Sequence, residues 1–172
     1  MTELECIAKW HGTDKGSHGY CPHYERFIGE LRFLPITMIE IGVAGGDSLR
    51  MWREWMPKAK IYGFDMNGYS MDDFTVIKGN QGEPNDLEQL LKETGSFHFL
   101  VDDGSHNSED QKVSFNTLWP RLLLGGWYVI EDSFGIGNCL DLEAVGRGDG
   151  DIEELHLIAK NNGDVILFLK KR

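Results

Sequence analysis

The feature that most constrains the fold is a regular alternation of short apolar runs with longer amphipathic runs, which begins at residue 36. The apolar runs are dense in branched and aromatic residues and are followed by glycine or polar residues, which is typical of buried strands. Strand–helix–strand units of roughly 25 residues imply right-handed crossovers and a parallel sheet. The predicted strands span residues 36–43, 60–67, 74–80, 97–104 and 126–134, and the predicted helices span residues 45–56 and 83–95, with a third from residue 108 that Pro120 ends.

The two ends of the chain depart from this alternation. Residues 152–160 and 165–172 are predicted to form two strands joined by a tight Asn-Gly turn, so we expect an antiparallel hairpin at one edge of the sheet. Residues 135–150 are rich in glycine and acidic residues and are predicted to form a loop. The predicted fold class is α/β and Rossmann-like, with a parallel sheet finished by an antiparallel C-terminal β-hairpin.

Residues 1–35 stand apart because they are too polar for a core segment. We expect them to form an N-terminal helical segment that covers the sheet as a lid; the alternative is a merely structural extension. Residues 36–172 would then form the ligand-binding part of the chain, and the two parts would together form a single compact domain.

Composition narrows the functional classes. The chain has 172 residues and a formal net charge of −11, and an acidic surface repels phosphate backbones, so no nucleic-acid partner is expected. No apolar run approaches the roughly 18 residues of a membrane helix, and the acidic N-terminus does not resemble a secretory signal. Cys6, Cys21 and Cys139 show no CxxC spacing, which favours a reducing cytoplasm over a disulfide framework. We therefore expect a cytoplasmic protein with no membrane partner.

A glycine turn follows the first predicted strand, in the sequence EIGVAGGDS. Gly42 and Gly45 allow the backbone to bend sharply and to approach a ligand closely. Asp65 ends the second strand, where an acid can bind both hydroxyls of a ribose. Dinucleotide-binding proteins use the order G-x-G-x-x-G, whereas this turn reads G-x-x-G-G and is followed by Asp47, which would repel a pyrophosphate. The turn therefore favours S-adenosylmethionine over NAD.

The third strand ends in two amides, Asn80 and Gln81. These side chains can bind the edge of an adenine ring, or they can satisfy the hydrogen bonds of a turn, and the sequence does not separate these alternatives.

Carboxylates follow the fourth and fifth predicted strands, as Asp102-Asp103 and Glu131-Asp132. If these strands are neighbours, at least two carboxylates converge and repel one another unless a cation binds them. Oxygen ligands favour Mg²⁺ or Ca²⁺ over zinc. A substrate hydroxyl on the metal would be a stronger acid, and His106 could take its proton as a general base.

Each of these side chains has a structural alternative. Asp102 could cap a helix or bind the amino group of the cofactor, Glu131 and Asp132 could be a solvated strand end, and His106 could be an ordinary loop histidine.

The segments GTDKGSHGY, IEIGVAGGDSLRMW, IYGFDMN, VDDGSH and VIEDSF, in this order, resemble the metal-dependent sugar O-methyltransferases of macrolide biosynthesis, of the mycinamicin 2''-O-methyltransferase type. More distantly, the chain is similar to the cephalosporin hydroxylase group. The resemblance spans residues 11–134 and, more loosely, the terminal hairpin.

This resemblance implies a class I S-adenosylmethionine fold of seven strands, the last antiparallel to the rest. It implies magnesium held by Asp103, Glu131 and Asp132, with His106 as the catalytic base. It also places the GTDK segment near the active site, with Asp14 and Lys15 as cofactor contacts. Glu40, in the IEIG segment of the first strand, and Asp102 are likewise expected at the cofactor. Two departures are a shorter chain than the relatives, and GNQ at residues 79–81 where many relatives have GDQ.

The sequence thus predicts an O-methyltransferase that uses S-adenosylmethionine and Mg²⁺. The expected acceptor is a sugar hydroxyl, such as that of a deoxysugar like rhamnose in a glycoside or glycan. The alternatives are a catechol O-methyltransferase, a nicotinamide oxidoreductase and a non-catalytic S-adenosylmethionine-binding subunit. A homo-oligomer, or a place in a longer multidomain chain, is compatible with all of these.

Overall fold

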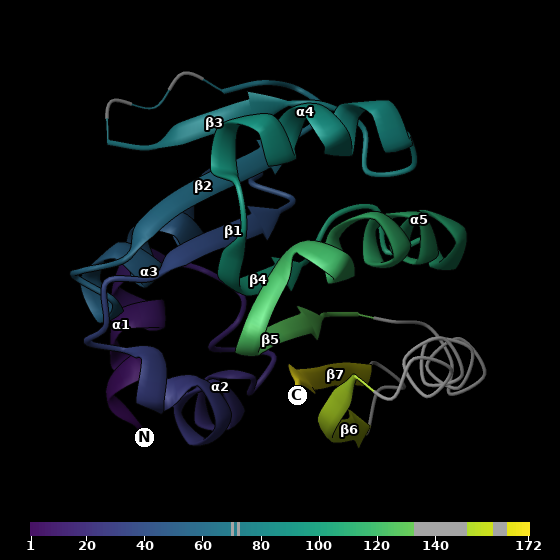
Figure 1. Cartoon of the computed structure of the whole chain (residues 1–172). Coiled ribbons are helices and arrows are strands. Elements are labelled where there is room, and N and C mark those ends of the chain that lie inside the picture. Colours follow the sequence, from purple (N-terminus) through teal and green to yellow (C-terminus); the bar gives the residue numbers. More distant parts are fainter. Residues whose placement is uncertain (70, 72, 133–150, 160–164) are drawn as a thin grey trace.

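The computed structural model describes residues 1–69, 71, 73–132, 151–159 and 165–172, and these residues form one twisted seven-stranded sheet (Figure 1). Its strand order is β3-β2-β1-β4-β5-β7-β6. The strands are β1 Thr37–Ile41, β2 Lys60–Asp65, β3 Thr75–Lys78, β4 Phe97–Asp102, β5 Leu122–Ile130, β6 Ile152–Ala159 and β7 Val165–Lys171. The helices are α1 Glu3–His11, α2 Cys21–Ile28, α3 Asp47–Trp55, α4 Pro84–Thr94 and α5 Ser108–Leu118, with 3₁₀ turns η1 Gly29–Leu31 and η2 Trp119–Arg121.

The first five strands are parallel to one another, and β7 pairs antiparallel with both of its neighbours, β5 and β6. This confirms the predicted fold class, because β6 and β7 pair with each other as a hairpin at one side of a parallel sheet. The later strand, β7, lies between β5 and β6 and pairs with both of them. The turn predicted at residues 161–164 and the loop predicted at residues 135–150 lie outside the described residues.

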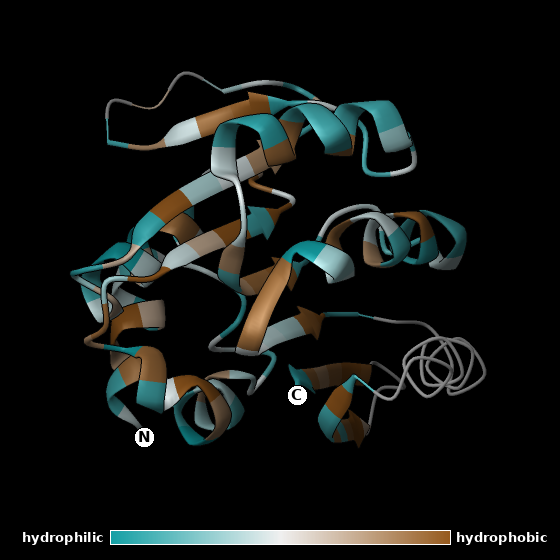
Figure 2. Cartoon of the chain, in the orientation of Figure 1, coloured by the Kyte–Doolittle hydropathy of each residue, from teal (hydrophilic) through white to brown (hydrophobic). Residues whose placement is uncertain are grey.

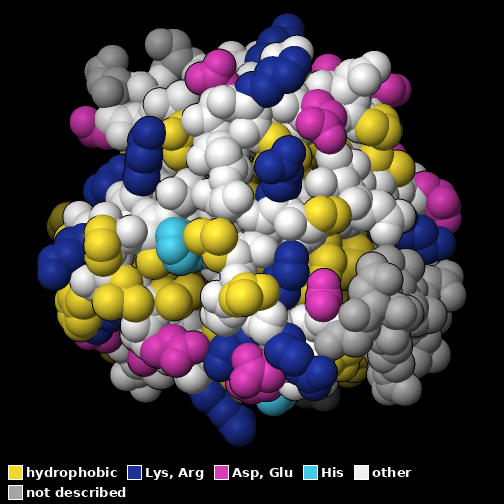
Figure 3. Space-filling view, in the orientation of Figure 1, with side chains coloured by type: hydrophobic (Ala, Val, Ile, Leu, Met, Phe, Trp, Pro, Cys, Tyr) yellow, Lys and Arg dark blue, Asp and Glu magenta, His cyan; other side chains and the backbone are white. Residues whose placement is uncertain are grey.

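Helices cover both faces of the sheet, with α1, α2 and α3 on one face and α4 and α5 on the other (Figure 1). Successive strand residues point to opposite faces, so Met38 of β1 packs in the first layer and Ile39 in the second. Because both faces are buried, the central strands are mostly apolar, as Figure 2 shows along β4 and β5, with Glu40 of β1 and Asp102 of β4 as buried exceptions. Figure 3 shows charges of both signs interspersed over one surface of the molecule, with hydrophobic side chains gathered at its left, over α1 and α3.

Residues 1–35 contribute to one of these core layers. Leu4, Ile7 and Ala8 of α1 are buried in the same cluster as residues of α3 and the sheet, and so are Tyr24 and Ile28 of α2. The N-terminal helices therefore complete the cover of one face of the sheet.

Several boundaries differ from the predicted ones. Strand β5 begins at Leu122, four residues before the predicted start, because the Gly125-Gly126 pair forms an irregularity within the strand rather than a loop before it. The strand ends at Ile130, so Glu131 and Asp132 follow it. Helix α3 begins at Asp47, two residues after the predicted start at residue 45, because Gly46 is its N-cap in the left-handed conformation.

No helix of the described part of the chain is both long enough and apolar enough to cross a bilayer.

Candidate active site

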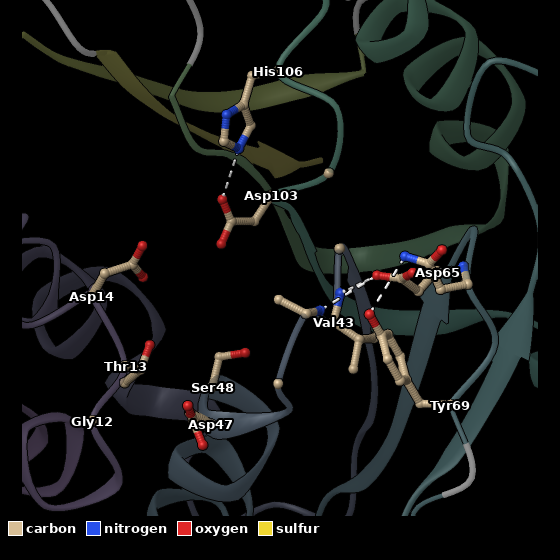
Figure 4. A pocket seen from close by; sticks show the side chains of 15 residues that line it. Gly12, Thr13, Asp14, Val43, Asp47, Ser48, Asp65, Tyr69, Asp103 and His106 are labelled. Carbon is tan, nitrogen blue, oxygen red and sulfur yellow. Dashed lines mark hydrogen bonds and ion pairs between the residues drawn. The ribbon is translucent and has the colours of Figure 1, made fainter.

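A cavity of about 560 Å³ opens at the carboxyl ends of β1, β2 and β4 (Figure 4). One wall is the turn after β1, which contains Gly42 and Gly45, and the facing wall includes Asp14 from the N-terminal segment. Asp103 and His106 lie at one end of the cavity and Asp65 at the other. In an open α/β sheet, this edge is where ligands bind.

Gly42 explains how close the elements approach one another here. Its φ is +85°, and a Cβ at this position would lie 2.0 Å from the backbone oxygen of Asp103. A residue with a side chain would thus be strained in its backbone and would also push β1 and β4 apart.

Asp65 holds the glycine turn in place from the end of β2. One of its carboxylate oxygens accepts a hydrogen bond from the backbone nitrogen of Val43 at 2.9 Å, and the other accepts one from Asn67 at 2.8 Å. The predicted ribose-binding acid therefore sits beside the turn and lines the cavity, half-buried.

Asn80 and Gln81 line a second, smaller hollow of about 160 Å³ next to Asp65. The Gln81 side chain makes two internal hydrogen bonds: its nitrogen donates to Asp102 at 3.0 Å, and its oxygen accepts from the backbone of Ser105 at 2.6 Å. The Asn80 side-chain oxygen accepts a hydrogen bond from the backbone nitrogen of Gly82 at 3.0 Å. Asn80 thus satisfies a hydrogen bond of the turn, which is one of the two alternatives that the sequence left open.

Behind the cavity wall, Lys15 lies at the centre of three carboxylates. Its Nζ is 2.6 Å from Asp103 Oδ2, 2.9 Å from Glu131 Oε2 and 3.5 Å from Glu40 Oε1. Lys15 and Glu40 have no solvent-accessible surface, and neither lines the cavity. The structure thus places these two predicted cofactor contacts against each other, and Glu131 against Lys15.

Two tyrosines of the N-terminal segment bind the carboxylates that follow β5. The Tyr24 hydroxyl donates to Glu131 Oε1, and the Tyr20 hydroxyl donates to Asp132 Oδ1. Both tyrosines are fully buried. They were not among the predicted site residues, although their spacing of four along a helix is a signal that they share a face.

Burial and neighbouring charges together determine the direction of the pKa shifts in this cluster. Burial alone would lower the pKa of the Lys15 ammonium, but Asp103, Glu131 and Glu40 outweigh it and raise that pKa well above its ordinary value. Burial also opposes ionisation of Asp103, yet Lys15 and His106 lower the pKa of Asp103 to about 2. Burial raises the pKa of Glu131 and that of Glu40, because one ammonium does not balance every carboxylate around it.

Asp102 is buried beside this cluster but faces the opposite core layer. It accepts hydrogen bonds from Gln81 at 3.0 Å and from Ser114 of α5 at 2.5 Å. Burial raises the pKa of Asp102 to about 6 despite these two donors. It does not line the cavity, so the structure places this predicted cofactor contact behind the wall as well.

His106 stands at the rim of the cavity, with Nε2 3.2 Å from Asp103 Oδ1 (Figure 4). This hydrogen bond raises the pKa of His106. Single atoms of Asp103, His106 and Asp132 lie within 4.8 Å of one another, an arrangement that could hold a metal ion. Of the residues predicted to bind metal, Asp103 and Asp132 belong to this group, and Glu131 does not.

Helix α5 begins at Ser108, two residues after His106. Asn107 is its N-cap, and the Asn107 side chain accepts a hydrogen bond from the backbone nitrogen of Glu109 at 2.9 Å. His106 and Asp132 both have positive φ, at 57° and 50°. Backbone strain of this kind is common where side chains are held for function.

A sheet of this order, with a glycine turn after β1, an acid at the end of β2 and carboxylates after β4 and β5, is the fold of a class I methyltransferase. Comparison with solved structures supports this fold assignment. The chain superimposes with a TM-score of 0.83 on the MycE methyltransferase of the mycinamycin biosynthetic pathway, crystallised with Mg and SAH, at 28% identity over 99% of this chain and 55% of that one. A putative ribosomal RNA methyltransferase from Plasmodium falciparum, at 16% identity and a TM-score of 0.70 over 88% of this chain and 94% of that one, shares the fold alone.

Curated relatives confirm the resemblance to sugar O-methyltransferases. The chain is 34% identical over 162 residues to the 8-demethyl-8-(2-methoxy-alpha-L-rhamnosyl)-tetracenomycin-C 3'-O-methyltransferase of Streptomyces olivaceus, covering 84% of this chain and 42% of that protein. It is 38% identical over 125 residues to the mycinamicin VI 2''-O-methyltransferase of Micromonospora griseorubida, covering 67% and 31%. The chain therefore spans less than half the length of these relatives, and it matches no protein-family model.

Proposed function

We propose that this chain carries the catalytic centre of an S-adenosylmethionine-dependent O-methyltransferase that requires a divalent cation. The cation that we propose is Mg²⁺. The observation that carries the proposal is the convergence of Asp103, His106 and Asp132 at one end of the cavity whose other end is the glycine turn and Asp65. A nucleoside cofactor and a polar acceptor would meet between them.

The cofactor would lie along the turn of Gly42 and Gly45, with its ribose at Asp65. Its amino acid end would face Asp14, whose exposed carboxylate lines the opposite wall and suits an ammonium group. Its adenine would enter the hollow beside Asn80 and Gln81. Lys15, Glu40 and Asp102 would support this cavity from behind.

The donor set fits a hard cation, because it consists of carboxylate oxygens with one imidazole beside them. Asp103 and Asp132 would hold the ion, with Glu131 completing the set if it moves from Lys15. When bound, such an ion supplies Lewis acidity and orients hydroxyl groups.

His106 would act as the general base. The acceptor oxygen forms a bond to the methyl carbon, the carbon–sulfur bond breaks, S-adenosylhomocysteine leaves, and the imidazole takes the hydroxyl proton. Asp103 holds the ring by its hydrogen bond to Nε2. The acceptor would be a hydroxyl of a sugar in a small glycoside, as the names of the relatives indicate for those proteins.

The experiment that tests this function is a calorimetric titration with S-adenosylmethionine and, separately, with NAD, each with Mg²⁺ and with EDTA. We expect micromolar binding of S-adenosylmethionine that survives EDTA, because the ion serves the acceptor. Absence of S-adenosylmethionine binding in every condition would refute the proposal, and binding of NAD in its place would make the chain a nicotinamide-binding protein.

The role of His106 is tested by His106→Ala. We expect methyl transfer to fall by at least about 10²-fold, as for loss of a general base, with an unchanged dissociation constant for S-adenosylmethionine. His11→Ala is the matched control, because His11 pairs with Glu54 outside this cavity. A wild-type kcat in His106→Ala would remove His106 from the chemistry.

A further inference from the structure

Three buried polar side chains of the N-terminal segment contact the carboxylates behind the candidate active site. Lys15 reaches Asp103 and Glu131, and Tyr20 and Tyr24 bind the two residues that follow β5. These contacts join positions 88 to 116 residues apart in the chain. Such a set is not needed to hold a helix on a sheet, because the apolar side chains of α1 and α2 already pack there.

Lys15 is the unusual member of the set. A fully buried ammonium loses its hydration, so it is stable only with close, ionised partners. It has three carboxylates within 3.5 Å, and four lie in the cluster when Asp132 is included. The Lys15 ammonium therefore faces more carboxylates than one positive charge can balance.

Asp103 is shared between Lys15 and the group that could hold a metal ion. Its Oδ2 lies 2.6 Å from the Lys15 ammonium, whereas its Oδ1 lies 3.2 Å from His106 and faces the cavity side. A divalent cation bound by Asp103 and Asp132 would thus use a carboxylate that already carries one cation.

We propose that Lys15 is a positioning residue that acts as a built-in cation: its ammonium fixes the Asp103 and Glu131 carboxylates and lowers the affinity of the cluster for a divalent cation. The inference rests on the proposed function in that a divalent cation binds this cluster. Two cations that share one carboxylate repel each other, and the repulsion is strong where little water screens it. By linkage, a bound divalent cation also weakens the hold of Lys15 on the sheet.

The test is the dissociation constant of Mg²⁺ and of Mn²⁺, measured by calorimetry on the whole chain without cofactor or acceptor. Lys15→Met removes the charge and keeps most of the length, so we expect binding at least roughly tenfold tighter than in the wild type. Lys15→Arg keeps the charge and should bind like the wild type. Lys112→Met is the matched control, because Lys112 pairs with Glu109 at the surface at 3.0 Å.

Thermal unfolding in EDTA and in Mg²⁺ gives a second, independent measurement. Lys15→Met should unfold at a lower temperature than the wild type in EDTA, and Mg²⁺ should raise its Tm by more than it raises that of the wild type. If Lys15→Met does not fold, Lys15→Gln keeps a hydrogen-bond donor for Asp103 while removing the charge, and the same results are expected.

Cation binding that is unchanged or weaker in the uncharged variants, or an equal Tm rise in all variants, would overturn the role of Lys15 and leave the proposed function standing. Absence of Mg²⁺ and Mn²⁺ binding in the wild type and in every variant would overturn the metal part of the proposed function, and this inference with it.

Discussion

Gly42 and Gly12 both have a positive φ angle but lie in different surroundings. Their φ values are +85° and +78°; a Cβ on Gly42 would meet Asp103 and Gly104 within 3 Å, whereas one on Gly12 would meet nothing within 4 Å. We expect Gly12→Ala to lower the free energy of unfolding by about 1 kcal/mol, the backbone term alone. Gly42→Ala should lower it by about 3 kcal/mol or more, because the steric clash adds to the same backbone term.

Urea unfolding of the two variants measures this difference. Equal losses of stability would show that the turn relaxes away from β4 without cost, which would contradict the close approach of the two strands.

At the residue scale, the sequence predicts what local spacing encodes. Gly42, Asp65, Asp103 and His106 lie at or just after strand ends. Their place at one edge of the sheet therefore follows from the strand assignment alone, and each of them lines the cavity. The partners of Lys15 were not predictable in this way. These partners depend on how residues 1–35 fold back over the sheet, and the hydrophobic periodicity of the sequence does not predict that arrangement.

The connection between β4 and α5 shows how one element is positioned by another. Gln81, after β3, accepts a hydrogen bond from the backbone of Ser105 at 2.6 Å, and a Cβ on Gly104 would lie 1.9 Å from the same Gln81 oxygen. The segment that carries His106 is thus packed directly on the Gln81 side chain.

We expect Gln81→Leu to speed hydrogen exchange of the Ser105 amide by roughly tenfold, the equivalent of one lost hydrogen bond. Gln89→Leu, on the exposed face of α4, is the control and should leave this amide unchanged. Amide exchange followed by NMR, with the affinity for S-adenosylmethionine alongside, makes the measurement. Unchanged Ser105 exchange together with weaker cofactor binding would instead make Gln81 a direct contact of the cofactor.

At the element scale, hydrophobic periodicity was sufficient to identify the strands and helices of the sheet region. The misplaced boundaries have local causes. Gly125-Gly126 resembles a turn, but the pair lies within β5, where the register with β4 shifts. Helix α3 begins two residues after its predicted start at residue 45, because Gly46 at positive φ is its N-cap.

At the scale of the whole molecule, the packing of the N-terminal helices on the sheet determines how reactive the cysteines are. Cys21 is fully buried in the core layer shared by the N-terminal helices and the sheet, and burial raises the pKa of its thiol to about 12. Cys6 is exposed. Because the thiolate is the reactive form, we expect an alkylating reagent at pH 8 to label Cys6 and to leave Cys21 unmodified until urea unfolds the protein.

Peptide mapping by mass spectrometry checks this in a Cys139→Ser background, since Cys139 lies outside the described residues. Labelling of Cys21 in the native protein at the rate of Cys6 would mean that residues 1–35 detach from the sheet without global unfolding.

The order of the strands in space has a consequence for the order of events during synthesis. Strand β6 precedes β7 in the chain, yet β7 lies between β6 and β5, so β6 has no neighbour in the sheet until β7 has emerged from the ribosome. The residues of the carboxylate cluster, in contrast, lie between positions 15 and 132, so all of them precede β6 in the chain. A nascent chain can therefore assemble the cluster first, while the outer edge of β5 stays open and is a place where a chaperone or another nascent chain can pair.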